Sequence, residues 1–151
     1  MGRVGVRPAL PLRTDLAIWD REMTQLKVTE EQHQRSLVDW WKWACKKYHV
    51  PERLLFHPPS EGVRSVVFAA RLKQVGWRKG MADIQLFVPS SRYHALFIEL
   101  KAMKGRPQPE QLAYLADLRA QGYAACLCYG DEAAISCIMD YMDGREIPEK
   151  M

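Results

Sequence analysis

Two carboxylates and a lysine in the middle of the chain have the types and spacing needed to bind a divalent cation. Glu99 and Lys101 are two residues apart within an apolar, strand-like segment, and Asp83 precedes another apolar segment. Residues two apart in a β-strand project from the same face. The pattern therefore places Glu99 and Lys101 on one face, with Ile98 and Leu100 on the other.

The expected hairpin brings the second carboxylate to the first. Residues 81–88 and 94–101 are predicted to be strands joined by a turn at 89–93, and a hairpin symmetric about Ser91 sets Asp83 opposite Glu99. Directly opposed carboxylates repel each other across a sheet, so a positive group is needed between them. Lys101 is one candidate. The other is a hard cation such as Mg²⁺, which commonly binds one or two carboxylates together with substrate phosphates.

A plainer interpretation competes with the metal site. Asp83 could cap a strand end, while Glu99 and Lys101 form a solvated face, because charged residues two apart are common. The apolar neighbours of Glu99 favour a buried strand instead, and a buried ionised acid needs a partner. The residues alone leave both interpretations open.

The elements that must position these side chains begin with a helix. Residues Thr29 to Gln32 form a capping box, and the apolar pattern that follows predicts a helix that ends before Pro51. Leu37 and Trp41 lie on one face of this helix, and Glu30 extends the same line by a turn. A carboxylate is therefore directed towards the core.

The remaining pattern predicts an α/β fold, a mixed sheet flanked by helices. We expect a single domain over residues 29–151 after an N-terminal arm, 1–28. Its further elements are a short strand at 53–57, a helix at 63–75 stopped by Gly76, the hairpin, a helix at 109–122, a strand at 123–129 and a helix at 131–142.

Composition narrows the functional classes. The chain of 151 residues carries a net charge of +4, which favours an anionic partner. Its four cysteines form no C-x-x-C pair, so we expect reduced, buried thiols. Neither a secretion signal nor an apolar stretch long enough to span a membrane is evident. We expect a soluble, cytoplasmic protein.

Several blocks together resemble a known nuclease family. Glu30 to Gln34 is similar to its E-x-x-x-Q helix, residues 58–83 to its central block, Phe97 to Lys101 to its E-x-K strand, and Pro109 to Gln111 with Gly122-Tyr123 to its following helix and strand. The family is the virus-type replication-repair nuclease (VRR-NUC) domain of the PD-(D/E)xK superfamily. The resemblance implies the restriction-endonuclease-like fold.

The resemblance also implies residue roles. Asp83 and Glu99 correspond to the metal ligands, with the backbone carbonyl of Leu100 as a third and Glu30 as an additional acid. Lys101 corresponds to the catalytic lysine and Gln111 to a supporting glutamine. The expected cofactor is Mg²⁺ or Mn²⁺. Ala82 stands where the superfamily usually has proline, a residue that supplies no ligand.

The expected substrate is DNA. Basic residues flank the proposed site and are predicted to contact phosphates: Arg64, Arg71, Lys73, Arg78, Lys79 and Lys104. The resemblance implies a homodimeric DNA-repair endonuclease that acts on branched DNA such as Holliday junctions. The alternative is a catalytically silent DNA-binding module of the same fold.

Overall fold

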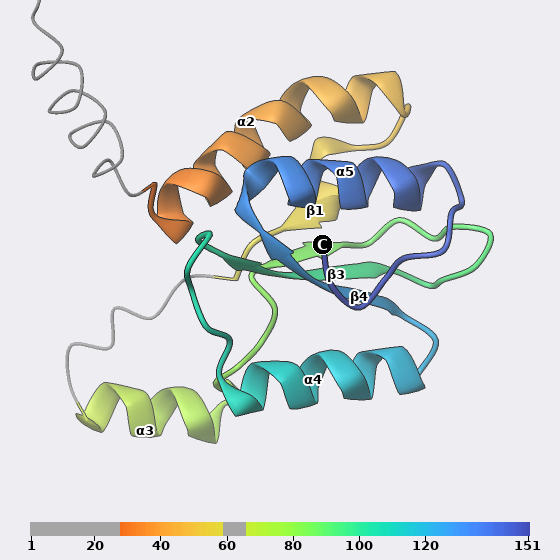
Figure 1. Cartoon of the computed structure of the whole chain (residues 1–151). Coiled ribbons are helices and arrows are strands. Elements are labelled where there is room, and N and C mark those ends of the chain that lie inside the picture. Colours follow the sequence, from red (N-terminus) through yellow and green to blue (C-terminus); the bar gives the residue numbers. More distant parts are fainter. Residues whose placement is uncertain (1–27, 59–65) are drawn as a thin grey trace, which may run out of the picture.

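A mixed four-stranded sheet forms the centre of the computed structural model, which describes residues 28–58 and 66–151 (Figure 1). The first three strands pair in antiparallel fashion and the last two in parallel, in the order β1-β2-β3-β4. The strands are β1 Leu55–Phe56, β2 Ile84–Leu86, β3 Leu96–Lys101 and β4 Ala124–Tyr129.

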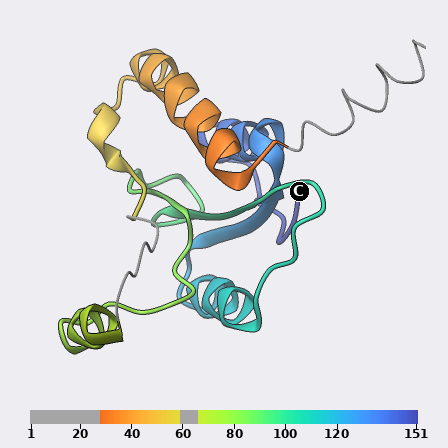
Figure 2. The same ribbon diagram turned by 90° about the vertical axis from the view of Figure 1, so that its left-hand side faces the viewer.

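Helices cover both faces of this sheet. Helices α2 (Glu30–Lys47) and α5 (Gly130–Met142) pack side by side on one face, and α4 (Pro109–Ala120) covers the other (Figures 1 and 2). Helix α3 (Val66–Gln74) stands away from the sheet, and η1 (Glu52–Leu54) is a short 3₁₀ turn before β1. The predicted α/β class is confirmed. No helix in the described part of the chain is long and apolar enough to cross a membrane.

Helix α2 begins where the capping box predicted. The Thr29 backbone N–H donates to Gln32 Oε1 at 2.8 Å, and the Gln32 N–H donates to Thr29 Oγ1 at 3.2 Å. These bonds satisfy two N–H groups that the helix itself cannot pair. Leu37 and Trp41 are buried as predicted. The capping box therefore sets the helix register that gives Glu30 its place at the first residue.

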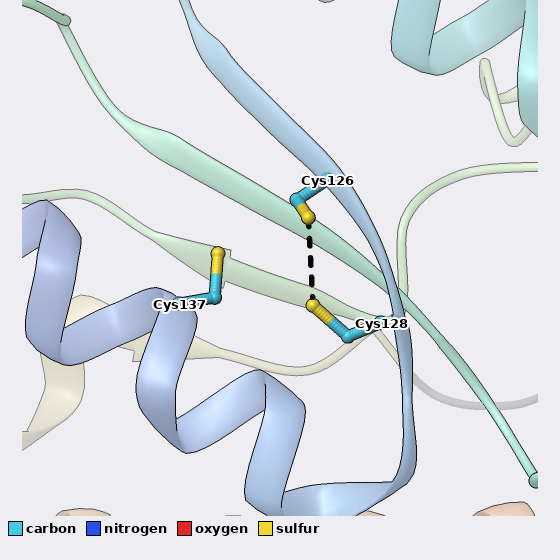
Figure 3. Close-up of side chains that lie close together, drawn as sticks. All are labelled: Cys126, Cys128 and Cys137. Carbon is cyan, nitrogen blue, oxygen red and sulfur yellow. Dashed lines mark hydrogen bonds between the residues drawn. The ribbon is translucent and has the colours of Figure 1, made fainter. Parts of the chain in front are cut away.

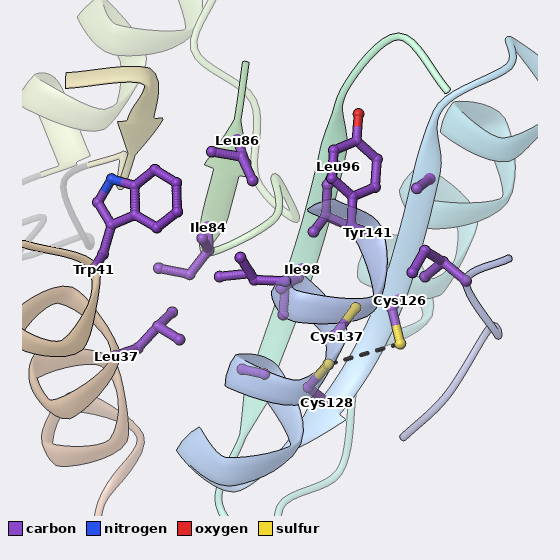
Figure 4. Close-up of a cluster of buried hydrophobic side chains, with 14 of the residues drawn as sticks. Leu37, Trp41, Ile84, Leu86, Leu96, Ile98, Cys126, Cys128, Cys137 and Tyr141 are labelled. Atoms are coloured by element: carbon purple, nitrogen blue, oxygen red, sulfur yellow. Dashed lines mark hydrogen bonds between the residues drawn. The ribbon is translucent and has the colours of Figure 1, made fainter. Parts of the chain in front are cut away.

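Two apolar cores lie on opposite faces of the sheet. The larger one, beneath α2 and α5, includes Leu37, Trp41, Ile84, Leu86, Leu96, Ile98 and Tyr141 (Figure 4). The smaller one, beneath α4, includes Phe97, Leu115 and Leu118. Alternation along β3 sends Ile98 and Leu100 into the larger core and Phe97 into the smaller one. Glu99 and Lys101 follow Phe97 on its face, as predicted.

The predicted hairpin strands were too long. The strand expected over residues 81–88 is regular only at Ile84–Leu86, and the one expected from residue 94 begins at Leu96. The Asp83 side chain gives one reason, because its carboxylate rather than a backbone carbonyl accepts the N–H of Leu100 at 2.8 Å. The regular backbone pairing between β2 and β3 therefore begins only at Ile84.

The outer edge of β4 is covered by the end of the chain. The N–H of Leu127 donates to Glu149 O at 2.9 Å, and the N–H of Met151 donates to Leu127 O at 2.9 Å. This pairing removes an open edge that could join another strand. The N-terminal arm proposed for residues 1–28 lies almost wholly outside the described residues, so its boundary stays a prediction.

Candidate active site

Asp83 and Glu99 face each other at the end of the β2–β3 hairpin. Ile84 pairs with Ile98, and the next step of this register sets Asp83 opposite Glu99. The predicted symmetry about Ser91 is therefore confirmed. The bond from the Leu100 N–H to Asp83 Oδ2 fixes the carboxylate of Asp83 against the backbone of β3.

Glu99 is a fully buried acid whose side chain is only half satisfied. Its Oε1 accepts from Lys101 Nζ at 2.8 Å and from Gln111 Nε2. Its Oε2 is buried without a hydrogen-bond partner among the described residues. Burial first, and then the charge of Asp83, raise the pKa of Glu99 to about 7. An unpartnered buried oxygen beside a second acid is suited to binding a cation.

Lys101 holds the nearest positive charge. Its Nζ lies 2.8 Å from Glu99 Oε1 and 3.6 Å from Glu30 Oε1. Burial alone would lower the pKa of Lys101, but the hydrogen bond and charge of Glu99, with the charges of Glu30 and Asp83, raise it on balance. A single ammonium therefore faces three carboxylates. The surplus of negative oxygen ligands suits a hard divalent cation such as Mg²⁺ or Mn²⁺.

Gln111 is held by the start of α4. Its Oε1 accepts the backbone N–H of Gln108 at 2.8 Å, which leaves its amide nitrogen to donate to Glu99. Pro109 occupies the first helical turn, where its missing N–H costs nothing. Gly80 lets the preceding loop approach this turn, because a Cβ there would lie 3.1 Å from Glu110 Cβ and 3.3 Å from Gln111 N, at a φ of +85°.

Glu30 reaches the site from the opposite layer. Its side chain is 49% exposed, so it lies at the rim rather than in the interior. The turn after β3 closes over it, since a Cβ on Gly105 would lie 3.2 Å from Glu30 Oε1. The structure thus brings together the five side chains predicted for the site: Glu30, Asp83, Glu99, Lys101 and Gln111.

A polar network near Glu30, buried only at His33, was not predicted from the sequence. His33 Nδ1 lies 2.6 Å from Asp131 Oδ1, and the Ser36 hydroxyl donates to Asp131 Oδ2 at 2.6 Å. Burial raises the pKa of Asp131, but the hydrogen bonds from Ser36 and His33 outweigh it, and the pKa is lowered. These contacts tie the first turns of α2 to the start of α5. Residues 98 apart carry no local pattern that could have indicated the pair.

A pocket of about 710 Å³ opens beside Asp83 and Gln111. The residues that line it come from β1, the loop before β2 and the start of α4; they include His57, Trp77, Arg78, Lys79, Asp83, Gln108, Gln111 and Tyr114. The His57 Nδ1–H donates to the backbone carbonyl of Asp83 at 2.6 Å. This contact supports the position of an acid at the pocket, which agrees with the structural role expected for His57 from the sequence rather than that of a proton carrier.

Two of the predicted DNA-contacting residues lie at this pocket. Arg78 and Lys79 line the pocket. Arg71 and Lys73 are exposed on α3, and Lys104 is exposed in the turn after β3. Arg64 lies outside the described residues. The structure thus places two of these cations at the pocket and leaves three exposed elsewhere on the surface.

A comparison with models of known protein families shows which family the chain belongs to. The VRR-NUC domain model matches residues 22–132. The chain belongs to the VRR-NUC family. A solved VRR-NUC domain protein is 25% identical, with a TM-score of 0.67, over 81% of this chain and 94% of that one. No curated protein matches the chain.

Membership in the VRR-NUC family confirms the resemblance drawn from the sequence and the nuclease-like α/β fold. VRR-NUC is a nuclease-type family. The matched range includes every predicted site residue from Glu30 to Gln111. It ends at residue 132, so most of α5 lies beyond it.

Proposed function

We propose that this VRR-NUC protein is a metal-dependent endonuclease that hydrolyses phosphodiester bonds in DNA. The observation that carries the proposal is the buried, unpartnered Oε2 of Glu99 beside the carboxylate of Asp83. Both acids have raised pKa values in the metal-free chain, and burial is the largest cause for each. A polypeptide that folds around two such acids gives up stability, and cation binding would offset that loss.

The proposed cation ligands are Asp83, Glu99 and the backbone carbonyl of Leu100, with Glu30 at the rim. Bound there, Mg²⁺ or Mn²⁺ supplies Lewis-acid chemistry, neutralising the phosphate and lowering the pKa of a water. The protein's own oxygens provide a hard ligand set without a soft donor, which suits these ions.

Lys101 is the proposed catalytic lysine. The ammonium group of Lys101 lies 2.8 Å from Glu99 Oε1. It is therefore already positioned and charged before a phosphate binds at the site. There it orients the attacking water and stabilises the negative charge that develops on the phosphoryl oxygens. Gln111 keeps the Glu99 carboxylate oriented by donating to the oxygen that Lys101 also contacts.

The proposed substrate enters across the 710 Å³ pocket. Arg78 and Lys79 at its wall, with the exposed Arg71 and Lys73 of α3 and Lys104 of the turn after β3, supply the charge that binds DNA phosphates. We include Arg64 in this set from its sequence position. Trp77 also lines the pocket and offers an aromatic surface to a base or sugar.

A silent DNA-binding module is the alternative function. The juxtaposition of Asp83 and Glu99 argues against it, because binding phosphates does not require opposed acids, and these acids repel DNA. A cleavage assay in Mg²⁺, Mn²⁺ or EDTA separates the two. Cleavage that depends on the cation supports the endonuclease, whereas DNA binding without any cleavage supports the module.

The finer proposal is a homodimer that cuts branched DNA such as four-way junctions. The described residues offer a limited basic surface at and beyond the pocket beside Asp83, and a two-fold dimer would double that surface and present paired sites. Exposed apolar side chains are available for such an interface, among them Trp43 on α2 and Val66 and Val67 on α3. Light scattering and a panel of single-strand, flap, duplex and junction DNAs test it. A monomeric mass, or flaps cut faster than junctions, would contradict it.

A further inference from the structure

Three of the four cysteines meet in the interior. Cys126 and Cys128 are two residues apart on β4 and therefore point to the same face of the sheet. Cys137 of α5 packs against them on that face (Figure 3). The three sulfur atoms all lie within 4.8 Å of one another, and Cys126 Sγ and Cys128 Sγ are 3.7 Å apart. All three residues are fully buried. The fourth, Cys45, is buried in α2 and lies outside this cluster.

The size of this sulfur triangle suits a single ion. When three atoms lie within 4.8 Å of one another, a central point exists no more than about 2.8 Å from each. Bonds between thiolate sulfur and first-row metal ions are about 2.3 Å long. Side-chain shifts of a few tenths of an ångström would therefore bring the three sulfurs to bonding distance. The triangle spans a strand and a helix, so an ion at its centre would join β4 to α5.

The chemical type of the ligands and the apolar environment of the three sulfurs indicate which kind of ion would bind. The cluster belongs to the larger apolar core, which also contains Ala134 and Ile138, and Figure 4 shows it on the same side of the sheet as Ile98. The group of possible ligands found there contains sulfur alone. Sulfur ligands favour soft ions, while Mg²⁺ and Mn²⁺ prefer oxygen. The cluster thus has the opposite preference from the carboxylates Asp83 and Glu99.

The number of ligands selects further among soft ions. Thiolates select zinc, iron–sulfur clusters and Cu(I). Structural zinc sites and iron–sulfur clusters usually take four protein ligands, whereas the group of possible ligands found here has three. Cu(I) is therefore the member of this class that the three sulfurs suit best.

We propose that Cys126, Cys128 and Cys137 form a binding site for a soft monovalent metal ion, with Cu(I) as the physiological member of that class. The ion binds the sulfurs of Cys126, Cys128 and Cys137 as thiolates, in place of the hydrogen bond between Cys128 and Cys126, and the thiol protons that it displaces pass to the solvent. No residue is oxidised or reduced. The site is independent of the proposed nuclease centre, because its sulfurs face α5 while Glu99 faces α4.

The direct test is Cu(I) binding under anaerobic conditions. The reduced, metal-free protein is titrated with Cu(I) against a chromogenic Cu(I) chelator and then examined by native mass spectrometry. We expect one ion per chain, retained against the chelator, and X-ray absorption that shows sulfur neighbours at about 2.3 Å. A chain that releases all Cu(I) to the chelator, or that holds it through nitrogen or oxygen, overturns the proposal.

Matched variants locate the ion. Cys137→Ala is expected to lower Cu(I) affinity at least tenfold, whereas Cys45→Ala, which also removes a buried thiol, is expected to leave it unchanged. Equal affinities in the two variants would contradict the site. Alkylation of the wild-type chain in mild denaturant gives a readout that needs no folded variant. Bound Cu(I) should protect Cys126, Cys128 and Cys137 while Cys45 reacts at its usual rate, and protection of none of the three overturns the proposal.

Discussion

Replacing Glu99 with glutamine should stabilise the metal-free protein at high pH. The buried carboxyl group has a pKa of about 7 instead of its ordinary 4.5. Between these two pH values the folded chain holds a proton on Glu99 that the unfolded chain has released. The free energy of unfolding of the wild type therefore falls as pH rises through this window, and the fall stops above pH 7.

The size of the effect follows from the shift. One pKa unit corresponds to about 1.4 kcal/mol, so the rise from 4.5 to about 7 amounts to about 3 kcal/mol. Glu99→Gln keeps the shape of the side chain and removes the charge. Between pH 4.5 and pH 8, the wild type should thus lose about 3 kcal/mol of stability relative to the variant. Comparing the two pH profiles cancels any constant effect of the substitution on packing.

The assay is urea unfolding followed by circular dichroism, at steps from pH 4.5 to pH 8 in EDTA. Glu146→Gln, which changes an exposed glutamate, is the matched control and should follow the wild-type profile. Adding Mg²⁺ at pH 8 should then raise the stability of the wild type more than that of Glu99→Gln. Parallel profiles for wild type and Glu99→Gln would refute the reasoning, because the buried charge would then cost nothing.

Three further predictions concern neighbouring residues. Asp83→Asn should weaken Mn²⁺ binding at least tenfold in calorimetric titration, and unchanged affinity would remove Asp83 as a ligand. Lys101→Ala should reduce the cleavage rate at least a hundredfold while changing DNA affinity less than threefold, as measured by single-turnover kinetics and anisotropy; equal losses would make Lys101 a phosphate anchor. Gly80→Ala, strained by its positive φ and the close approach to α4, should lower stability by about 1–3 kcal/mol and slow cleavage by displacing Gln111. Stability equal to that of the wild type in urea unfolding would show that the loop adapts.

The features that could be predicted from the sequence are those that depend on residues close together in the chain. The capping box at Thr29 placed the start of α2, and the strand alternation placed Glu99 on the face of β3 opposite to Ile98. The hairpin symmetry about Ser91 gave the opposition of Asp83 and Glu99, because a turn of known centre fixes the register of both strands. The approach of Gln111 came from the family resemblance rather than from any spacing.

Other features depended on tertiary contacts that no local rule contains. The contact between His33 and Asp131 joins residues 98 apart. Strand alternation could have placed Cys126 and Cys128 on one face, but nothing in the sequence indicated that Cys137 of α5 would pack against them. The late start of β2 at Ile84 follows from the Asp83 side chain, which takes the N–H of Leu100, a contact that periodicity cannot predict.

The most direct test of the proposed metal-dependent DNA cleavage is a metal-jump experiment on preformed complexes. Wild-type protein and Asp83→Asn are each bound to labelled four-way junction DNA in EDTA, excess Mn²⁺ is added, and products are followed on a denaturing gel. Wild-type protein should cleave only after the addition, and Asp83→Asn should stay bound with a rate at least a hundredfold lower. Cleavage before the addition, or equal rates for the two proteins, would contradict the proposed centre.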